Sequence, residues 1–391
     1  MRVHWLWLSR LTKVSPLHKR KLLQLFGDPE QLYNADIRHL RDLGFLSADA
    51  LEQLSEKDLA QTMRLAEHCQ HCGIDYITIQ DSGYPPRLRA LEDAPLVLYY
   101  KGRLPDFEQR PVIGVVGTRH ASKAGLQAAE KLGGEIAACG GLVVSGGAAG
   151  IDICALKGAH AAGMPTVTVL AGGLDRIYPK ENEPYLQKFC EYGCMISENA
   201  PGSPVYKASF LQRNRIISGM SNGVLVVEAP ERSGALNTAR WGREQGKEIF
   251  AVPGQPGDPT CEGSNRLLDD GAISATSGWA VMRVYAQRFP YTVAQREYRS
   301  AAPVFSAPNR KNDKKDIDKQ PSSAYSVIEK PLPPLSEREQ MLVNRLKRGP
   351  VLQDLLAAEA GMDTGEIMRL ITVLSMKDVV DTNPEGMVFL K

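Results

Sequence analysis

The stretch Val112–Arg119, which reads VIGVVGTR, decides the fold of the middle of this chain. An apolar run ends in a glycine, which predicts a short strand that is buried on both faces and followed by a tight turn. Further runs of this kind alternate with helical patterns, and glycine follows most of them at once. These runs are Leu142–Val144, Thr166–Leu170, Val224–Val227 and Ile249–Val252.

The repeated order of strand, glycine turn and helix predicts an α/β fold with an open, doubly wound parallel sheet. In such sheets, ligands bind beyond the carboxyl ends of the strands. The glycine turns of this chain lie at that edge, so we expect its binding site there.

Residues 1–80 alternate short helical patterns with turn residues. The patterns lie at Leu17–Phe26, Ala35–Leu43 and Ala48–Leu59. They predict a small N-terminal helical module, and the sequence leaves open whether it is of the helix-hairpin-helix or the sterile-alpha-motif type. The sheet domain then spans residues 81–285.

Residues 286–334 are rich in proline and polar residues, which predicts a flexible linker. A last compact unit spans residues 335–391. Helical patterns over Glu337–Leu346, Val351–Ala360 and Gly365–Leu374 precede a hairpin signal within Val379–Leu390. Three helices and a hairpin predict a C-terminal winged helix.

Composition excludes several classes of protein. The 391 residues are 43% hydrophobic, and 47 basic against 45 acidic residues give a net charge of only +2. An anion must therefore be bound by local clustering of cations. No apolar run approaches the ~20 residues that span a bilayer. Seven cysteines do not resemble a disulfide framework. We expect a cytoplasmic protein with no membrane partner.

Two glycine loops are candidates for anion binding. Backbone N–H groups at Gly117-Thr118-Arg119 and at Ser145–Asp152 could hold a phosphate, and Arg119 adds a cation. The alternatives are a tight turn and structural packing. Neither loop is a G-x-G-x-x-G motif or a P-loop, so the sequence predicts no nucleotide cofactor.

The segment around Phe210 is the most informative. Lys207, Arg213 and Arg215 supply cations, and Phe210 supplies a ring for base stacking. A solvated helix start with Phe210 in the core is the alternative. Ser233–Ala239 could likewise hold a phosphate or act as a helix N-cap.

No catalytic or metal centre is predicted. The pattern His68–Cys72 reads HCQHC, but a second pair of ligands at a fitting distance is missing, so a helix with incidental cysteines is the better interpretation. No residue has the sequence context of a nucleophile or a triad. We therefore expect no catalytic residue, no metal and no cofactor.

Taken together, these motifs resemble the DNA-processing protein A (DprA/Smf) family. The similarity covers residues 84–273, about half of the chain. This chain departs from the family pattern at Gly147 and Ala149, where a basic side chain is missing, near Ala155, where a histidine is usual, and at Leu211, where a proline is common. The matching stretches are Tyr84–Leu88, Pro95–Gly102, Val115–Arg119, Ser145–Asp152, Gly173–Asn182, Ser197–Glu198, Phe210–Ile217, Val226–Ala229, Ser233–Ala239 and Ala251–Gly254.

The resemblance implies a Rossmann-like domain that binds single-stranded DNA, forms a homodimer through residues near 250–273 and catalyses no reaction. It also implies a role in natural transformation, in which incoming single strands are protected and a RecA-type recombinase is loaded. The implied DNA contacts fall into three groups. Arg119, Lys207, Arg213 and Arg215 hold phosphates, Phe210 and Asn214 shape the pocket or touch a base, and the glycine loops contribute through Gly117, Ser145 and Gly146.

Two other functions remain open at this stage. The first is a nucleoside-monophosphate phosphoribohydrolase that resembles the lysine-decarboxylase-like (LOG) family. Against it, Trp241 follows Thr238 where that family needs a glutamate. The second is a regulator that binds duplex DNA through its winged helix. Because Arg369 is the sole basic residue of Gly365–Leu374, a partner-binding role fits this helix better.

Overall fold

The computed structural model describes residues 2–298, 336–346, 351–352, 356, 362–377, 379–382 and 387–390. These residues fall into two compact units, one within residues 1–316 and one within residues 317–391. Each unit has its own apolar core.

The first unit begins with the predicted helical module. Side-chain caps begin several of its helices: Ser15 accepts from the N–H of His18, Asp28 from that of Glu30, and Ser47 from that of Ala50. The helices are α1 (Arg2–Arg10), α2 (Pro16–Phe26), α3 (Pro29–Asn34), α4 (Ile37–Asp42), α5 (Ala48–Ser55) and α6 (Ala60–His71). They bury Trp7, Leu22, Leu32, Leu40 and Leu54 in a shared core.

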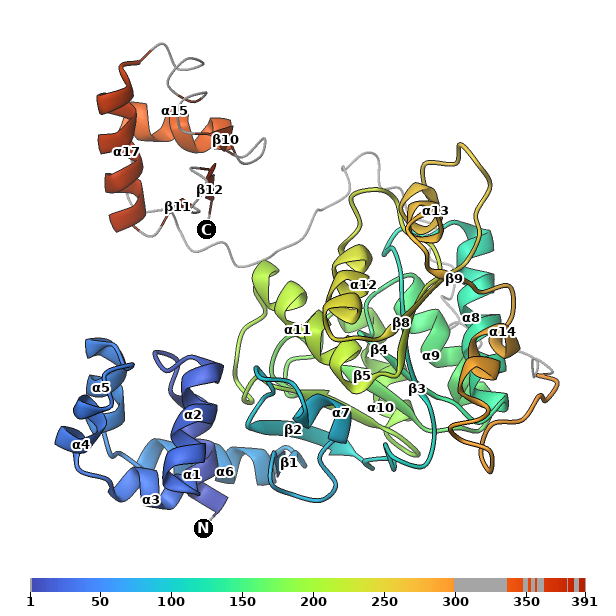
Figure 1. Ribbon diagram of the computed structural model, residues 1–391, viewed down its shortest axis with the longest axis horizontal. Helices are drawn as coiled ribbons and strands as arrows, with labels where there is room; N and C mark the ends of the chain where they lie inside the picture. Colours follow the sequence, from blue (N-terminus) through green and yellow to red (C-terminus); the bar gives the residue numbers. More distant parts are fainter. Residues whose placement is uncertain are drawn as a thin grey trace, which may run out of the picture. The chain divides into compact units, whose positions relative to one another are not determined.

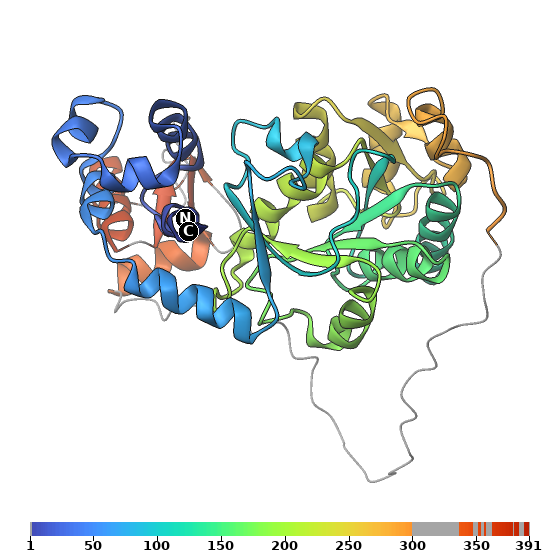
Figure 2. The ribbon, with the colours of Figure 1, turned by 90° about the horizontal axis from the view of Figure 1, so that it is seen from below.

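Helix α6 leads directly into the edge of a large sheet (Figure 2). Strand β1 (Asp75–Thr78) pairs antiparallel with β2 (Val97–Gly102), which follows the short helix α7 (Pro86–Arg89). Strand β2 in turn pairs antiparallel with β6 (Cys194–Ser197). The helical module is therefore continuous with this edge of the sheet.

The sheet has nine strands in the order β1-β2-β6-β5-β4-β3-β7-β8-β9. All pairs from β6 to β9 are parallel, and all five predicted runs are strands. The fold class is thereby confirmed, with an antiparallel pair added at one edge. The remaining strands are β3 (Val112–Val116), β4 (Leu142–Ser145), β5 (Thr166–Val169), β7 (Gly223–Val226), β8 (Glu248–Ala251) and β9 (Ile273–Ser274).

Helices cover both faces of the sheet (Figure 1). Helix α8 (Lys123–Ala138) packs closely on α9 (Ile151–Ala161), and α11 (Lys207–Met220) packs on α12 (Gly234–Glu244). A Cβ on Gly133 would collide with the carbonyl of Ala155, so glycine permits the close approach of α8 and α9. Because both faces are covered, every residue of β3 is buried.

The strand order reverses next to β3, which has β4 on one side and β7 on the other. The chain leaves β3 and β7 toward opposite faces of the sheet, since α8 packs with α9 and α12 with α11. Such a switch point opens a crevice at the carboxyl ends of the strands. The loop Gly117–Ser122 and the loop after β7 border it.

Further helices connect or follow the strands of this unit. They are α10 (Glu183–Phe189), α13 (Glu262–Asp269), α14 (Gly278–Met282) and the 3-10 helices Lys180–Asn182 and Arg283–Tyr285. Residues 286–298 were predicted to begin the linker, but Thr292 Oγ1 donates to Gln109 O at 2.7 Å and Val293 is buried. These residues therefore belong to the folded unit. The rest of the predicted linker lies outside the described residues.

The second unit is the predicted winged helix. Its elements are α15 (Glu337–Leu346), β10 (Val351–Leu352), α17 (Thr364–Met376), β11 (Val380–Thr382) and β12 (Met387–Leu390). The strands form a three-stranded sheet in the order β10-β12-β11. One correction concerns the helix predicted from residue 351, because Val351 and Leu352 pair with β12 and are a strand.

Candidate functional site

Arg119 lies in the loop that follows β3, at the switch point of the sheet. Its guanidinium carbon is 4.4 Å from the centroid of the Phe210 ring, which is a cation–π contact. Gly117, half-buried, precedes it, and a Cβ there would collide with the side chain of Ile151. The glycine therefore lets this loop pack against the start of α9 and fixes the position of Arg119.

Lys207 and Phe210 lie in the first turn of α11. They are three residues apart, so they share one face of the helix. Lys207 is exposed, and no acidic residue lies in this first turn. The positive end of the helix and the ammonium of Lys207 both favour an anion here. The structure thus places Arg119 against the Phe210 ring and Lys207 on the same face of α11 as that ring.

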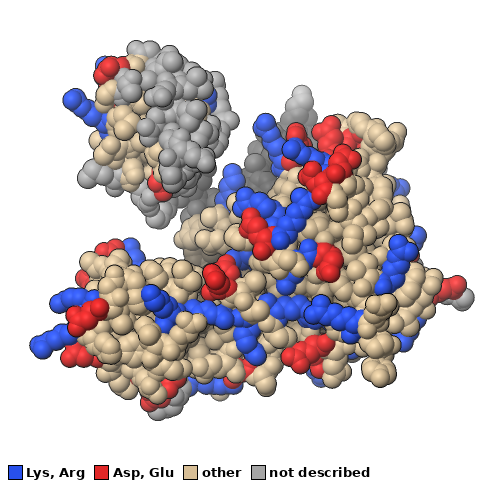
Figure 3. Space-filling model, in the orientation of Figure 1, with Lys and Arg blue, Asp and Glu red and all other residues tan. Residues whose placement is uncertain are grey.

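Within the described residues, neither Arg119 nor Lys207 forms an ion pair with a carboxylate. On the face drawn in Figure 3, basic side chains lie among acidic ones, in line with the net charge of +2. Affinity for an anion must therefore come from local cations without carboxylate partners, and this pair has that property.

A residue of the matching stretch Gly173–Asn182, which the sequence analysis did not assign to the site, joins this group. Tyr178 lies in the loop after β5, also at the carboxyl edge, and its ring centroid is 5.9 Å from that of Phe210. Its side chain is 40% exposed. An aromatic residue shortly after the glycine turn Gly172-Gly173 was the available signal.

Arg213, which the sequence placed among the phosphate contacts, is directed into the protein in this structure. Its side chain is buried, and Nη1 donates to the carbonyls of Gly146, at 2.7 Å, and Val169. Burial lowers the pKa of Arg213 to about 10, and the nearby Asp152 carboxylate opposes this shift. Burial likewise raises the pKa of Asp152 above its ordinary value.

In the second glycine loop, Ser145–Asp152, the backbone of Gly146 bonds to the buried side chains of Asp152 and Arg213. The N–H of Gly146 donates to Asp152 Oδ2 at 3.1 Å, and the hydroxyl of Ser145 donates to Val115 O at 2.6 Å. The donors that were predicted to meet a ligand at Ser145 and Gly146 are therefore used inside the protein. Arg213 and Asp152 shape the loop from within.

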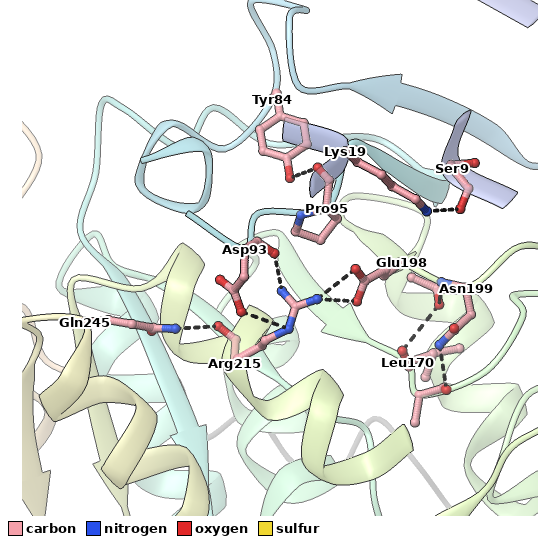
Figure 4. Close-up of polar contacts among 12 residues, drawn as sticks. Ser9, Lys19, Tyr84, Asp93, Pro95, Leu170, Glu198, Asn199, Arg215 and Gln245 are labelled. Carbon is pink, nitrogen blue, oxygen red and sulfur yellow. Dashed lines mark hydrogen bonds and ion pairs between the residues drawn. The ribbon is translucent and has the colours of Figure 1, made fainter. Parts of the chain in front are cut away.

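Arg215 also points inward (Figure 4). Its Nη2 donates to both carboxylate oxygens of Glu198 at 2.7 Å, and Nη1 donates to Asp93 O at 3.0 Å. Asn214 Nδ2 donates to Gly234 O at 3.3 Å and so joins α11 to α12. Arg215, predicted as a phosphate contact, thus bonds inside the protein, and Asn214, predicted to shape the pocket or touch a base, holds α11 against α12.

Glu228 is a structural residue of the site that residue patterns alone did not indicate. It follows β7 and is buried, and its carboxylate accepts from the N–H of Ser122 at 2.8 Å and from the Ser122 hydroxyl at 2.5 Å. It therefore links the two loops at the switch point. In Ser233–Ala239, the N-cap interpretation is confirmed, because Ser233 Oγ accepts from the N–H of Ala235.

The cysteine and histidine pattern of residues 68–72 serves packing contacts. His68 Nε2 lies 3.2 Å from Asp175 Oδ2, and Cys69 is buried. In the described part of the chain, no group of three or more His, Cys, Asp or Glu side chains is placed to hold a metal ion. The described helices include none that is long and apolar enough to cross a membrane.

Comparison with known proteins identifies two matching families. The family described as DNA recombination-mediator protein A matches residues 75–285, and the DprA winged helix domain matches residues 329–386. DNA processing protein DprA of Bacillus subtilis is 38% identical over 262 residues, which cover 67% of this chain and 88% of that protein. Protein Smf of Escherichia coli is 34% identical and covers 69% and 72% of the two chains.

Two solved structures share the fold. The X-ray structure of DprA from Streptococcus pneumoniae has a TM-score of 0.65 at 31% identity, and it covers 72% of this chain and 98% of that one. DNA processing protein A from Helicobacter pylori has a TM-score of 0.50 at 28% identity, and it covers 55% and 97%. That structure was described for its single-stranded DNA binding mode.

Proposed function

Since this chain belongs to the DNA recombination-mediator protein A family, we propose that it binds single-stranded DNA at the carboxyl edge of its sheet and alters none of its covalent bonds. The strand's phosphates are held by Arg119 and Lys207. We further propose that the protein acts in natural transformation, where it protects incoming single strands in the cytoplasm.

One observation carries this proposal. Arg119 contacts the Phe210 ring from a separate loop, Lys207 lies three residues before Phe210 in the first turn of α11, and neither cation forms an ion pair with a carboxylate among the described residues. Cations of this kind neutralise backbone phosphates and release counterions. Rings beside them provide faces on which unpaired bases stack. The relative from Helicobacter pylori, whose structure describes a single-stranded DNA binding mode, supports the same ligand.

Two protein partners complete the proposal. The first is a RecA-type recombinase, which the bound protein helps to load onto the strand. The second is another copy of this chain, joined through residues 250–273 of the sheet domain. Helix α13 lies in that range, and the adjacent Ile273 at the sheet edge is an exposed apolar residue.

The test measures the affinity for a labelled single-stranded oligonucleotide as a function of salt. In a log–log plot the slope is about −0.7 per phosphate contacted. Arg119→Ala and Lys207→Ala should each weaken binding and make the slope less steep by roughly 0.7. Arg64→Ala, which removes an exposed arginine from the helical module, is the control and should bind like the parent.

Equal affinity and slope for Arg119→Ala, Lys207→Ala and the parent would show that this site is assigned wrongly. Recovery of the oligonucleotide at full length after incubation tests the absence of catalysis. A shortened or base-depleted product that persists in a protein preparation free of contaminating nuclease would contradict that part of the proposal.

A further inference from the structure

We propose that Tyr178 is the platform on which an unpaired base stacks, directly beside the phosphates that Arg119 and Lys207 hold. This inference rests on the proposed function and extends it, because it assigns the selectivity for unpaired strands to one side chain. It also moves the base contact from Phe210, where the sequence placed it, to a neighbouring loop.

Phe210 is poorly placed to receive a base by itself. The guanidinium of Arg119 lies 4.4 Å from its ring centroid, and the Tyr178 ring packs against it at 5.9 Å with an interplanar angle of 59°. Both neighbours occupy space around the ring, and Phe210 is only partly exposed. Phe210 therefore holds Arg119 and Tyr178 in position, and the ring open to solvent is the one on Tyr178.

Tyr178 has the properties that base stacking requires. The residue is 40% exposed, so part of it is accessible to a ligand from solvent. Contact with Phe210 restrains the ring before binding, which reduces the entropy lost when a base docks. The loop that carries it follows β5, so Tyr178 lies at the same edge of the sheet as Arg119 and Lys207.

Other exposed tyrosines lack this combination. Tyr206 is 45% exposed beside Lys207, but no ring contact among the described residues holds it to Phe210. Tyr192 is 58% exposed and contacts the ring of His160 at 5.9 Å, but it precedes β6. It thus lies at the amino edge of the sheet, away from both cations, and is a matched control.

Stacking on Tyr178 would select for single strands. In a duplex both faces of each base are covered by neighbouring base pairs, so a protein ring has access only to a base that leaves the stack. The phosphates, by contrast, are available in both forms. Arg119 and Lys207 therefore supply affinity, and Tyr178 supplies the preference for unpaired DNA.

A purely structural role makes a different prediction. If Tyr178 served only to hold Phe210 and Arg119, its removal would disturb the phosphate contacts and weaken the binding of any strand. A stacking role affects only strands that carry bases. A strand of abasic sugars with the same number of phosphates separates the two roles.

The experiment uses the full chain and two probes, a short thymine homopolymer and an abasic strand of equal length. Tyr178→Ala should bind the thymine strand about tenfold more weakly, since stacking of one base has this order of effect. Its salt slope should equal that of the parent. On the abasic strand the parent and Tyr178→Ala should bind equally.

Three further variants complete the design. Tyr178→Phe keeps the ring and should bind like the parent, whereas Tyr178→Leu keeps bulk without a flat ring and should lose affinity as Tyr178→Ala does. Tyr192→Ala should bind both strands like the parent. Parental binding of the thymine strand by Tyr178→Ala, or equal losses on both strands, would overturn the inference. A parent that binds neither strand would instead refute the proposed function.

Discussion

At the scale of single residues, the arginines near Phe210 divide into two groups with different roles. Arg119 is half-buried with its guanidinium over the Phe210 ring, whereas Arg213 and Arg215 are buried and bond to carbonyls and carboxylates inside the protein. Residues two positions apart in a helix do not share a face. Arg213 and Arg215 therefore could not both have reached one phosphate site from the same side of α11.

Arg213 should matter for stability more than for binding. Removing one partner of a buried ion pair typically costs about 3–5 kcal/mol, because the other charge is left without compensation. Arg213→Ala removes the attraction between Arg213 and the buried Asp152 carboxylate together with the bonds to Gly146 and Val169, so we expect the free energy of unfolding to fall by roughly this amount. Urea denaturation at pH 7 measures it. Arg119→Ala, at the surface, is the comparison and should unfold at nearly the parental urea concentration. If the two variants had similar urea midpoints of unfolding, the proposed division between a structural Arg213 and a binding Arg119 would be contradicted.

The sequence predicted the place of the site better than its contacts. The glycines after buried strands indicated the carboxyl edge of the sheet, and Arg119 does contact Phe210 there. The orientation of Arg213, Asn214 and Arg215 depends on which side of α11 faces the sheet. Which side faces the sheet depends on partners that are distant in the sequence, such as Glu198 and Gly146, and no local pattern indicates them.

At the scale of elements, the helical module contacts a loop that borders the site. His68 in α6 contacts Asp175, and the Asp175 carboxylate also accepts from the N–H of Gly202 at 2.8 Å. Burial would raise the pKa of Asp175, but the bonds from Gly202 and His68 lower it below its ordinary value. Gly202 lies in the segment that precedes Lys207. The helical module is therefore linked, through His68 and Asp175, to the segment that carries Lys207.

Lys19 in α2 should make the stability of the protein depend on pH in a way that can be measured. Lys19 Nζ donates to Ser9 O at 2.8 Å and faces Glu198, and burial lowers the pKa of Lys19 to about 8, although Glu198 opposes the shift. In the unfolded chain its pKa is ~10.4. Below pH 8 the folded state carries the full cost of a buried charge. As pH rises above 8 the folded state loses this proton first, so stability should increase toward pH ~10.

The comparison of the parent with Lys19→Met isolates this effect from other groups that titrate in the same range. Urea unfolding at pH 7.5 and at higher pH, with the cysteines kept reduced, gives the difference in free energy of unfolding between the two proteins. We expect that difference to shift in favour of the parent as the pH rises. A difference that stays constant would show that Lys19 keeps an ordinary pKa in the folded chain.

Elements that depend on local pattern were predicted well, and elements that depend on distant partners were not. The runs that became β3, β4, β5, β7 and β8 are apolar on both faces, which is a local signal. Strand β9 has two residues and both are exposed, so only its pairing with β8 defines it. Val351 and Leu352 became a strand for the same reason, because β12 pairs with them.

At the scale of the whole molecule, the winged helix differs from a duplex-binding module in the surface of α17. Asp363 caps this helix and Glu366 lies in its first turn, whereas Arg369 is the one basic residue among its described positions. Its exposed side chains include Met368 and Val373. Duplex readers need cations for the backbone and polar groups for base edges. A helix with one cation and exposed apolar side chains fits contact with a protein better.

Removal of residues 317–391 should therefore leave DNA binding intact. The first unit has its own core, so the truncated chain is expected to fold. Because Arg119, Lys207 and Tyr178 all lie in that unit, single-strand affinity and its salt slope should match those of the full chain. Electrophoretic shifts with a single strand and its duplex, at two salt concentrations, measure both.

The full chain with Arg369→Ala separates a DNA contact on α17 from an indirect effect of truncation. If α17 contacts no DNA, this variant should shift both probes as the parent does. Loss of duplex binding in the truncated chain and in Arg369→Ala alike would place a DNA contact on the winged helix. Loss in the truncated chain alone would point to a role of the second unit in assembly, since the cations proposed to bind the strand would still be present.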